Sequence, residues 1–191
     1  MAYQTYITEA IVCGSWERNT ADKSILLFAR EAGMVYVQAK SIRREYSKQR
    51  YALQDASYAR VTLIRGKSGW KVASAEACAS LYARATTREA RALVRDTLLL
   101  LRRVMRGEVP HDGIFDDVLT VLSNNFDIEY KTLTAILFVR ILHTLGYVAP
   151  APAFAHLLSD TFPTAGVCML TPDVMHILEE VLQNALRESQ L

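Results

Sequence analysis

The hydrophobic periodicity of the chain changes near residue 80, and this change limits the possible folds more than any other feature. Before residue 80, apolar and polar residues alternate in short runs separated by turn residues, which is typical of β-strands. After residue 80, apolar residues recur at spacings of three and four, which is typical of amphipathic helices. We therefore predict an α+β protein, with a β domain over residues 1–80 and an all-α domain over residues 81–191.

Five runs in the first half are rich in β-branched and aromatic residues and predict strands. They cover residues 3–13, 24–30, 34–39, 58–65 and 70–76. Residues 14–22 are polar and predict a turn, whereas the short connections at 31–33 and 66–69 predict two antiparallel hairpins. Five strands, with a longer connection between the third and the fourth, predict an N-terminal OB-fold barrel. Barrels of this fold commonly bind oligonucleotides.

Start and stop signals divide the second half into helices. Thr86 with Glu89 predicts a capping box for the first of them. The helix over about residues 129–145 is almost wholly apolar, so we expect it to be central. Thr171 before Pro172 predicts the start of the last helix. The inward face of that helix is predicted to consist of Val174, Ile177, Leu178, Val181, Leu182 and Ala185.

The charge of the chain is unevenly distributed, although the formal net charge is only +2. Residues 1–80 carry twelve Lys and Arg against seven Asp and Glu, whereas residues 81–191 carry ten against thirteen. The first half is therefore the part of the chain that we expect to bind a polyanion.

A basic cluster follows the third predicted strand. Cations spaced along an extended backbone match a phosphate chain, and interleaved aromatic rings offer faces for unpaired bases. The predicted DNA-binding residues are Lys40, Arg43, Arg44, Lys48 and Arg50 of this cluster, Lys67 and Lys71 of the last hairpin, and Tyr46 and Tyr51 as stacking platforms. A charge run is also compatible with a solvated loop, and either tyrosine could instead pack on the barrel.

Arginines of the helical half are candidates for partner binding. Five of them lie on one side of the first predicted helix, where they could hold a phosphate backbone, an acidic peptide or only solvent. These are Arg88, Arg91, Arg95, Arg102 and Arg106. Arg140 interrupts the apolar central helix and therefore needs a carboxylate partner, either inside the protein or on another molecule. The tentative partner-binding residues are Arg140, Arg102 and Arg106.

Catalytic and metal-binding patterns are weak. Cys13, Cys78 and Cys168 lie far apart without ligand spacing, so we expect neither a zinc site nor a disulfide framework. No nucleophile elbow, phosphate loop or dinucleotide motif occurs, and His111 with Asp112 is the only hint of a hydrolase. We expect no enzyme activity and no cofactor. With no leader pattern and no long apolar segment, we also expect a cytoplasmic protein without a membrane partner.

Several segments resemble the bacterial recombination and repair protein family RecO. In the first half these are YITEAIV at 6–12, LFAREAG at 27–33, AKSIRR at 39–44, LQ at 53–54 and SAE at 74–76. In the second half, FVRILHTLGYV at 138–148 is similar to a family stretch that ends in Leu-Gly-Tyr. The order of these parts along the chain also agrees with the family.

The resemblance implies a non-enzymatic recombination mediator in the bacterial nucleoid that acts in the response to DNA damage. Family members bind single- and double-stranded DNA, anneal complementary strands, and cooperate with RecR to load RecA onto DNA coated by single-stranded-DNA-binding protein. The acidic C-terminal tail of that protein docks on the family's helical domain, so it is a possible partner of Arg140. The four-cysteine zinc site of many members is missing here, because residues 150–162 contain no cysteine.

Three questions stay open at the level of sequence. The chain is shorter than a typical family member, so contacts with partners could differ. Neither the preference for single- or double-stranded DNA nor the oligomeric state can be predicted from the sequence. The alternative function is that of a protein-interaction adaptor whose barrel no longer binds nucleic acid.

Overall fold

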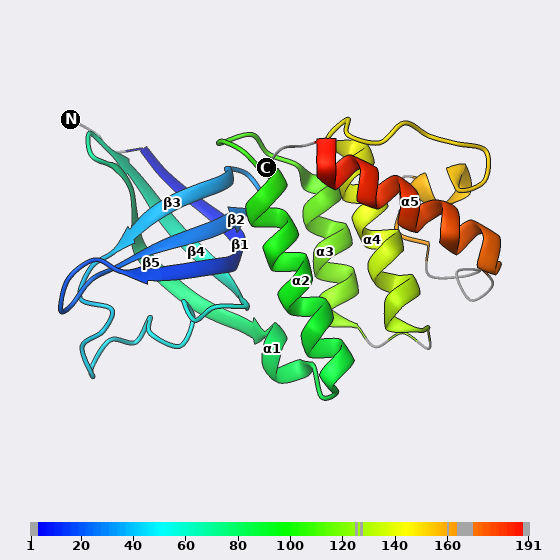
Figure 1. The fold of residues 1–191 in the computed structure, drawn as a ribbon. Helices are drawn as coiled ribbons and strands as arrows, with labels where there is room; N and C mark the ends of the chain where they lie inside the picture. Colours follow the sequence, from blue (N-terminus) through cyan, green and yellow to red (C-terminus); the bar gives the residue numbers. More distant parts are fainter. Residues whose placement is uncertain (1–3, 125, 127, 160, 164–169, 189–191) are drawn as a thin grey trace. The chain divides into compact units, whose positions relative to one another are not determined.

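A computed structural model describes residues 4–124, 126, 128–159, 161–163 and 170–188 (Figure 1). The chain forms two compact units. The first comprises residues 1–85 and 105–112, and the second comprises residues 86–104 and 113–191. The loop at 105–112 thus packs with the strands, although it lies inside the range that the sequence assigns to the helical domain. Among the described helices, none has the length and apolar character needed to cross a bilayer.

Five strands form a closed barrel in the first unit (Figure 1). They are β1 (Gln4–Glu17), β2 (Lys23–Ala29), β3 (Gly33–Ala39), β4 (Ser57–Gly66) and β5 (Gly69–Ser80). Around the barrel the order is β1-β2-β3-β5-β4, with β3 and β5 parallel and every other neighbouring pair antiparallel. This arrangement is that of an OB-fold, so the predicted fold class and both predicted hairpins are confirmed.

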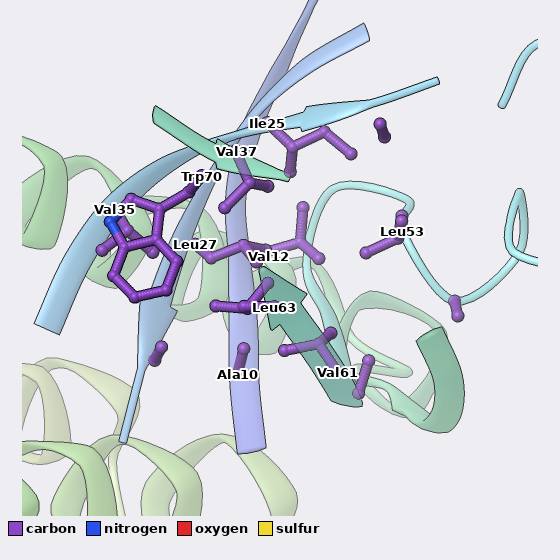
Figure 2. Packing of buried hydrophobic residues seen from close by; sticks show 14 of the residues in the cluster. Ala10, Val12, Ile25, Leu27, Val35, Val37, Leu53, Val61, Leu63 and Trp70 are labelled. Carbon is purple, nitrogen blue, oxygen red and sulfur yellow. The ribbon is translucent and has the colours of Figure 1, made fainter. Parts of the chain in front are cut away.

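Alternating side chains of the strands fill the barrel (Figure 2). Successive residues of a strand point to opposite faces, so every second residue reaches the interior. The interior residues labelled in the figure are Ala10, Val12, Ile25, Leu27, Val35, Val37, Leu53, Val61, Leu63 and Trp70. Trp70 is only 6% exposed and belongs to this core.

The turn predicted at residues 14–22 is shorter than expected, because β1 continues to Glu17. A β-bulge between Val12 and Gly14 shifts the register, and the strand then stays paired with β2. The remaining turn is closed by Asn19, whose Oδ1 accepts hydrogen bonds from the backbone N–H groups of Ala21 and Asp22. The polar composition of residues 14–17 predicted a turn, but these residues belong to β1, whose outward side chains contact solvent.

The loop at 105–112 is fastened to the barrel by polar contacts and by a close backbone approach. The indole Nε1 of Trp70 donates a hydrogen bond to Glu108 at 2.9 Å. Gly33 has a φ of +68°, and a Cβ at this position would lie 2.3 Å from the carbonyl oxygen of Val109. Only glycine therefore fits between β2 and β3 at this point.

The helices carry a second hydrophobic core. Their bounds are α1 (Leu81–Arg84), α2 (Arg88–Val104), α3 (Asp112–Ser123), α4 (Tyr130–Thr144), the 3-10 helix η1 (Ala155–Leu158) and α5 (Pro172–Glu188). Of these, α1 belongs to the first unit and was not predicted. In the second unit α4 packs against α2, α5 and η1, which confirms that the apolar helix is central.

Two details of the helix predictions are wrong. The N-terminal cap of α2 is Thr87, whose Oγ1 accepts a hydrogen bond from the N–H of Ala90. The helix begins at Arg88, one residue later than a capping box at Thr86 requires. On α5, Ile177 is 36% exposed, since the buried stripe centres on Leu178, Leu182 and Ala185. The predicted cap of α5 is confirmed by a hydrogen bond from the N–H of Val174 to the Oγ1 of Thr171.

Candidate nucleic-acid interface

The basic loop between β3 and β4, residues 40–56, is anchored in the barrel core. Ile42, Ala52 and Leu53 are 3%, 2% and 1% exposed and belong to the cluster of buried residues that fills the barrel. These apolar side chains thus close one mouth of the barrel. The charged residues that lie between Ile42 and Ala52 in the sequence are held at the rim of this mouth. The cations of this loop are consequently presented from a supported backbone.

Hydrogen bonds tie the start and the middle of the loop to the β1–β2 turn and to β5. The N–H of Ser41 donates to the carboxylate of Asp22 at 2.7 Å, and this bond is the main reason why the pKa of Asp22 lies below its usual value. Farther along, the side-chain amide of Gln49 donates to the carbonyl of Ala73 on β5 at 3.0 Å. The loop is therefore fastened both to the β1–β2 turn and to β5.

Two of the predicted DNA-binding arginines line a hollow at this mouth. Its volume is about 390 Å³, and its lining consists of Lys23, Ile42, Arg43, Arg50, Leu53 and Gln54. Arg43 also forms an ion pair with Glu17 at 3.0 Å and donates to the carbonyl of Asn19. Lys23 was not among the predicted site residues. Nothing near it in the sequence marks it, because its position depends on how the barrel closes.

Both predicted stacking tyrosines lie on the surface rather than against the barrel. Tyr46 is 73% exposed and Tyr51 is 65% exposed. Each is accompanied by an arginine: Arg44 lies 5.9 Å from the ring centre of Tyr46, and Arg50 lies 5.2 Å from that of Tyr51. The alternative that they pack on the barrel is wrong, whereas their role in stacking stays a prediction.

The other predicted cations lie on the loop and on the last hairpin. Lys40, Lys48 and Lys67 are exposed, and Lys71 is half-buried. In the parallel pairing of β3 and β5, Lys71 stands beside Gln38, two residues after Tyr36 on the same outer face. This register brings the hairpin cation Lys71 next to the outer face of β3.

Two exposed aromatic residues on the outer face of the barrel were missed by the sequence analysis. Trp16 on β1 is 40% exposed and Tyr36 on β3 is 64% exposed, and their ring centres are 5.9 Å apart. Strands 2 and 3 carry the usual oligonucleotide-binding face of OB-folds. Tyr36 could have been found, because it alternates with the inward residues Val35 and Val37, but Trp16 was assigned to a turn.

The tentative partner-binding arginines differ in their surroundings. Arg140 is 7% exposed and pairs with Asp117, with Nε 2.6 Å from one carboxylate oxygen and Nη2 3.2 Å from the other. Its Nη1 donates to the carbonyls of Leu157 and Ser159. The partner of Arg140 is therefore internal, which was one of the two alternatives.

The arginine stripe on α2 is shorter than predicted. The helix ends at Val104, so Arg106 lies in the loop that packs with the barrel. Arg102 is exposed in the last turn of α2. A partner contact at either residue stays a prediction.

A second polar cluster joins three segments of the barrel. The hydroxyl of Tyr58 on β4 donates to Glu9 on β1 at 2.6 Å, and Arg30 pairs with the same carboxylate at 3.2 Å. Burial and this hydrogen bond raise the pKa of Tyr58 to about 12, and the bond is also the main cause of the lowered pKa of Glu9. The cluster therefore links β1 to β4 and to the β2–β3 turn.

Metal-binding geometry is absent from the described residues, among which no three His, Cys, Asp or Glu side chains gather closely enough to hold an ion. Cys13 is buried and Cys78 is exposed. Cys168 lies outside the described residues. The predictions that the protein has no cofactor and no enzyme activity are untested by these observations.

The geometry defines a class of protein: an OB-type barrel whose longest loop presents cations at one mouth of the barrel. No family model matches the chain. Similarity is found to two curated proteins, both named DNA repair protein RecO, from Desulfitobacterium hafniense strains DSM 10664 / DCB-2 and Y51. Each is 38% identical over 63 residues, which is 33% of this chain. The matched region spans 23% of the length of each relative.

Proposed function

We propose that the protein is a RecO-like, non-enzymatic DNA-binding mediator of recombination in DNA repair. The observation that carries the proposal is the fixed basic loop on a closed OB-type barrel, because this surface suits a nucleic-acid backbone. The partial similarity to two DNA repair proteins named RecO supports the same role. In this role the protein binds single- and double-stranded DNA in the bacterial cytoplasm.

The DNA strand crosses the outer face of β1, β2 and β3 and reaches the loop at residues 40–56. Trp16 and Tyr36 supply exposed ring faces in the middle of this path, where unpaired bases stack. Lys and Arg side chains of the loop bind phosphates, and the counterions released from DNA drive the association. Such binding depends steeply on salt and little on base sequence.

Annealing follows from charge neutralisation and requires no bond chemistry. Two complementary strands repel each other through their phosphates, and a cationic surface that binds one or both reduces this repulsion. Stacking on aromatic rings holds a strand without covering its hydrogen-bonding edges, so its bases stay free to pair. The same neutralisation assists an incoming RecA filament, which RecR and this protein load onto DNA.

The helical unit is the proposed platform for protein partners. Between α4 and α5 lies a groove of about 400 Å³ lined by apolar residues that include Phe138, Leu182 and Leu186. At its rim Lys131 pairs with Glu179 at 2.7 Å, which raises the pKa of the lysine. An apolar groove suits a peptide with apolar residues, such as the tail of single-stranded-DNA-binding protein, whose acidic groups would compete with Glu179 for Lys131.

Strand annealing by the purified protein tests the proposal. We expect complementary oligonucleotides to anneal at least about tenfold faster with protein than without it at low salt, and the acceleration to disappear as salt screens the cations. The readout is quenching between a fluorophore and a quencher on the two strands. Failure to bind or anneal DNA at any salt concentration would instead support the adaptor function, and turnover with a divalent metal that His111→Ala abolishes would support a hydrolase.

A further inference from the structure

The hollow at the barrel mouth contains a lysine that the DNA path on the outer face does not use. Lys23 opens β2, opposite Glu17 on β1 and Ala39 on β3. It lies two residues before Ile25, a core residue, so its side chain leaves the strand on the inward face. Its Nζ donates to the Oγ of Ser15 at 3.3 Å and stays half-buried at the mouth.

Two arginines face the same hollow from the loop at residues 40–56. Arg43 and Arg50 line it together with Lys23, and the amide of Gln54 adds a neutral donor. Ile42 and Leu53 complete the lining, and both belong to the barrel core. The hollow is therefore a recess with an apolar floor and three cations around it.

The charge of the recess fits a doubly charged anion. Of its three cations, Arg43 is paired with Glu17 at 3.0 Å, which leaves a balance of two positive charges. A phosphate monoester carries about −1.5 to −2 charges at pH 7, whereas a phosphodiester within a strand carries one. Lys supplies a point charge, and Arg supplies the planar fork that binds phosphate oxygens in pairs.

The volume and closed floor of the recess favour the end of a strand over its middle. At about 390 Å³ it lies within the size range of about 300–1,000 Å³ for small-molecule sites, so it has room for more than a single ion. Ile42 and Leu53, which are 3% and 1% exposed, form its buried floor. A terminal nucleotide can enter as far as this floor, whereas a nucleotide in the middle of a strand is held at the surface by the backbone on both of its sides.

We propose that this recess binds a phosphate monoester, supplied by the phosphorylated end of a DNA strand or by a free nucleoside monophosphate. The strand end rests on the proposed DNA-binding function, whereas the mononucleotide does not. The recess then fixes the position of a strand end while the outer face holds the nucleotides that follow it.

Three single-stranded oligonucleotides of one sequence and with one internal fluorophore test the proposal. One carries a 5′-phosphate, one a 3′-phosphate, and one has hydroxyl groups at both ends. We expect one phosphorylated oligonucleotide to bind about tenfold more tightly than the hydroxyl-ended one by fluorescence anisotropy, since hydrogen bonds between charged groups are strong. Lys23→Gln is expected to reduce this preference to about twofold or less, and Arg84→Gln, an exposed cation outside the recess, to leave the preference unchanged.

Competition with a nucleoside monophosphate and with its nucleoside separates the two sources. Displacement of the phosphorylated oligonucleotide by the monophosphate alone supports the recess. Salt-sensitive but equal binding of all three oligonucleotides contradicts the proposal that the recess binds a phosphate monoester, and it leaves the proposed DNA-binding function unaffected. If no oligonucleotide binds, a rise in melting temperature with the monophosphate supports the recess without the DNA function, and no rise overturns both. Should Lys23→Gln fail to fold, Arg50→Gln, on the exposed side of the recess, gives the same comparison.

Discussion

Reversal of two loop charges, Arg43→Glu with Arg44→Glu, is expected to weaken binding to single-stranded DNA by about 10- to 100-fold at low salt and to abolish annealing. Both arginines are exposed on the loop that packs on the barrel. The double change removes two counterion-releasing contacts and adds two charges that repel phosphates. Fluorescence anisotropy measures the affinity, and the strand-annealing assay measures the rate.

A matched variant with the same change of net charge controls for long-range electrostatics. Arg84→Glu with Arg187→Glu reverses two cations in the last turns of α1 and α5. We expect this variant to lose less than about threefold in affinity, because neither arginine belongs to the loop and salt screens long-range interactions between exposed charges. Equal losses in the two variants would contradict a local binding site at the loop.

Folding must be separated from binding in this experiment, because Arg43 pairs with Glu17 and donates to Asn19. Arg44 makes its side-chain hydrogen bond to the exposed Tyr46. The single change Arg44→Glu should therefore keep the melting temperature of the native protein while it lowers affinity. A melting curve for each variant checks this expectation.

Removal of the buried carboxylate, Asp117→Ala, is expected to lower the free energy of unfolding by about 3–5 kcal/mol. Asp117 and Arg140 are each less than one-tenth exposed, and the variant leaves the guanidinium with two carbonyls but without the carboxylate that it pairs with. Burial raises the pKa of Asp117, although the hydrogen bond and charge of Arg140 oppose this effect. Denaturant unfolding followed by circular dichroism measures the loss.

Two comparisons show whether the loss comes from the unpaired charge. Asp116→Ala changes an exposed carboxylate on the same helix and should cost less than about 1 kcal/mol. The double variant Asp117→Leu with Arg140→Met removes both charges, so we expect it to recover part of the stability that Asp117→Ala loses. Recovery stays incomplete because the carbonyls of Leu157 and Ser159 lose their donor. A double variant less stable than Asp117→Ala would contradict an ion-pair origin.

The elements of the barrel were predictable because their signals are local. Alternation from Tyr58 to Arg65 and the Gly66–Gly69 turn predicted the β4–β5 hairpin, which the register confirms. The continuation of β1 to Glu17 was missed, because it depends on a bulge and on pairing with β2, neither of which leaves a signal in a polar segment.

The candidate site was only partly predictable, because its geometry depends on barrel closure. Charge density identified Arg43 and Arg50, but the recess also requires Lys23, which lies some twenty residues away in the sequence. The Trp16–Tyr36 pair likewise joins β1 to β3 across β2. The carboxylate partner of Arg140 could be expected from burial alone, whereas its identity as Asp117 needed the packing of α3 and α4.

The salt dependence of binding to a single-stranded oligonucleotide tests the central claim most directly. If about five cations of the barrel unit contact phosphates, the logarithm of the association constant falls with the logarithm of salt concentration with a slope of about −3.5. Arg43→Glu with Arg44→Glu should make this slope shallower by about 1.4, for two lost contacts. A wild-type slope near zero, or a slope that the double variant leaves unchanged, would contradict a DNA-binding surface built on this loop.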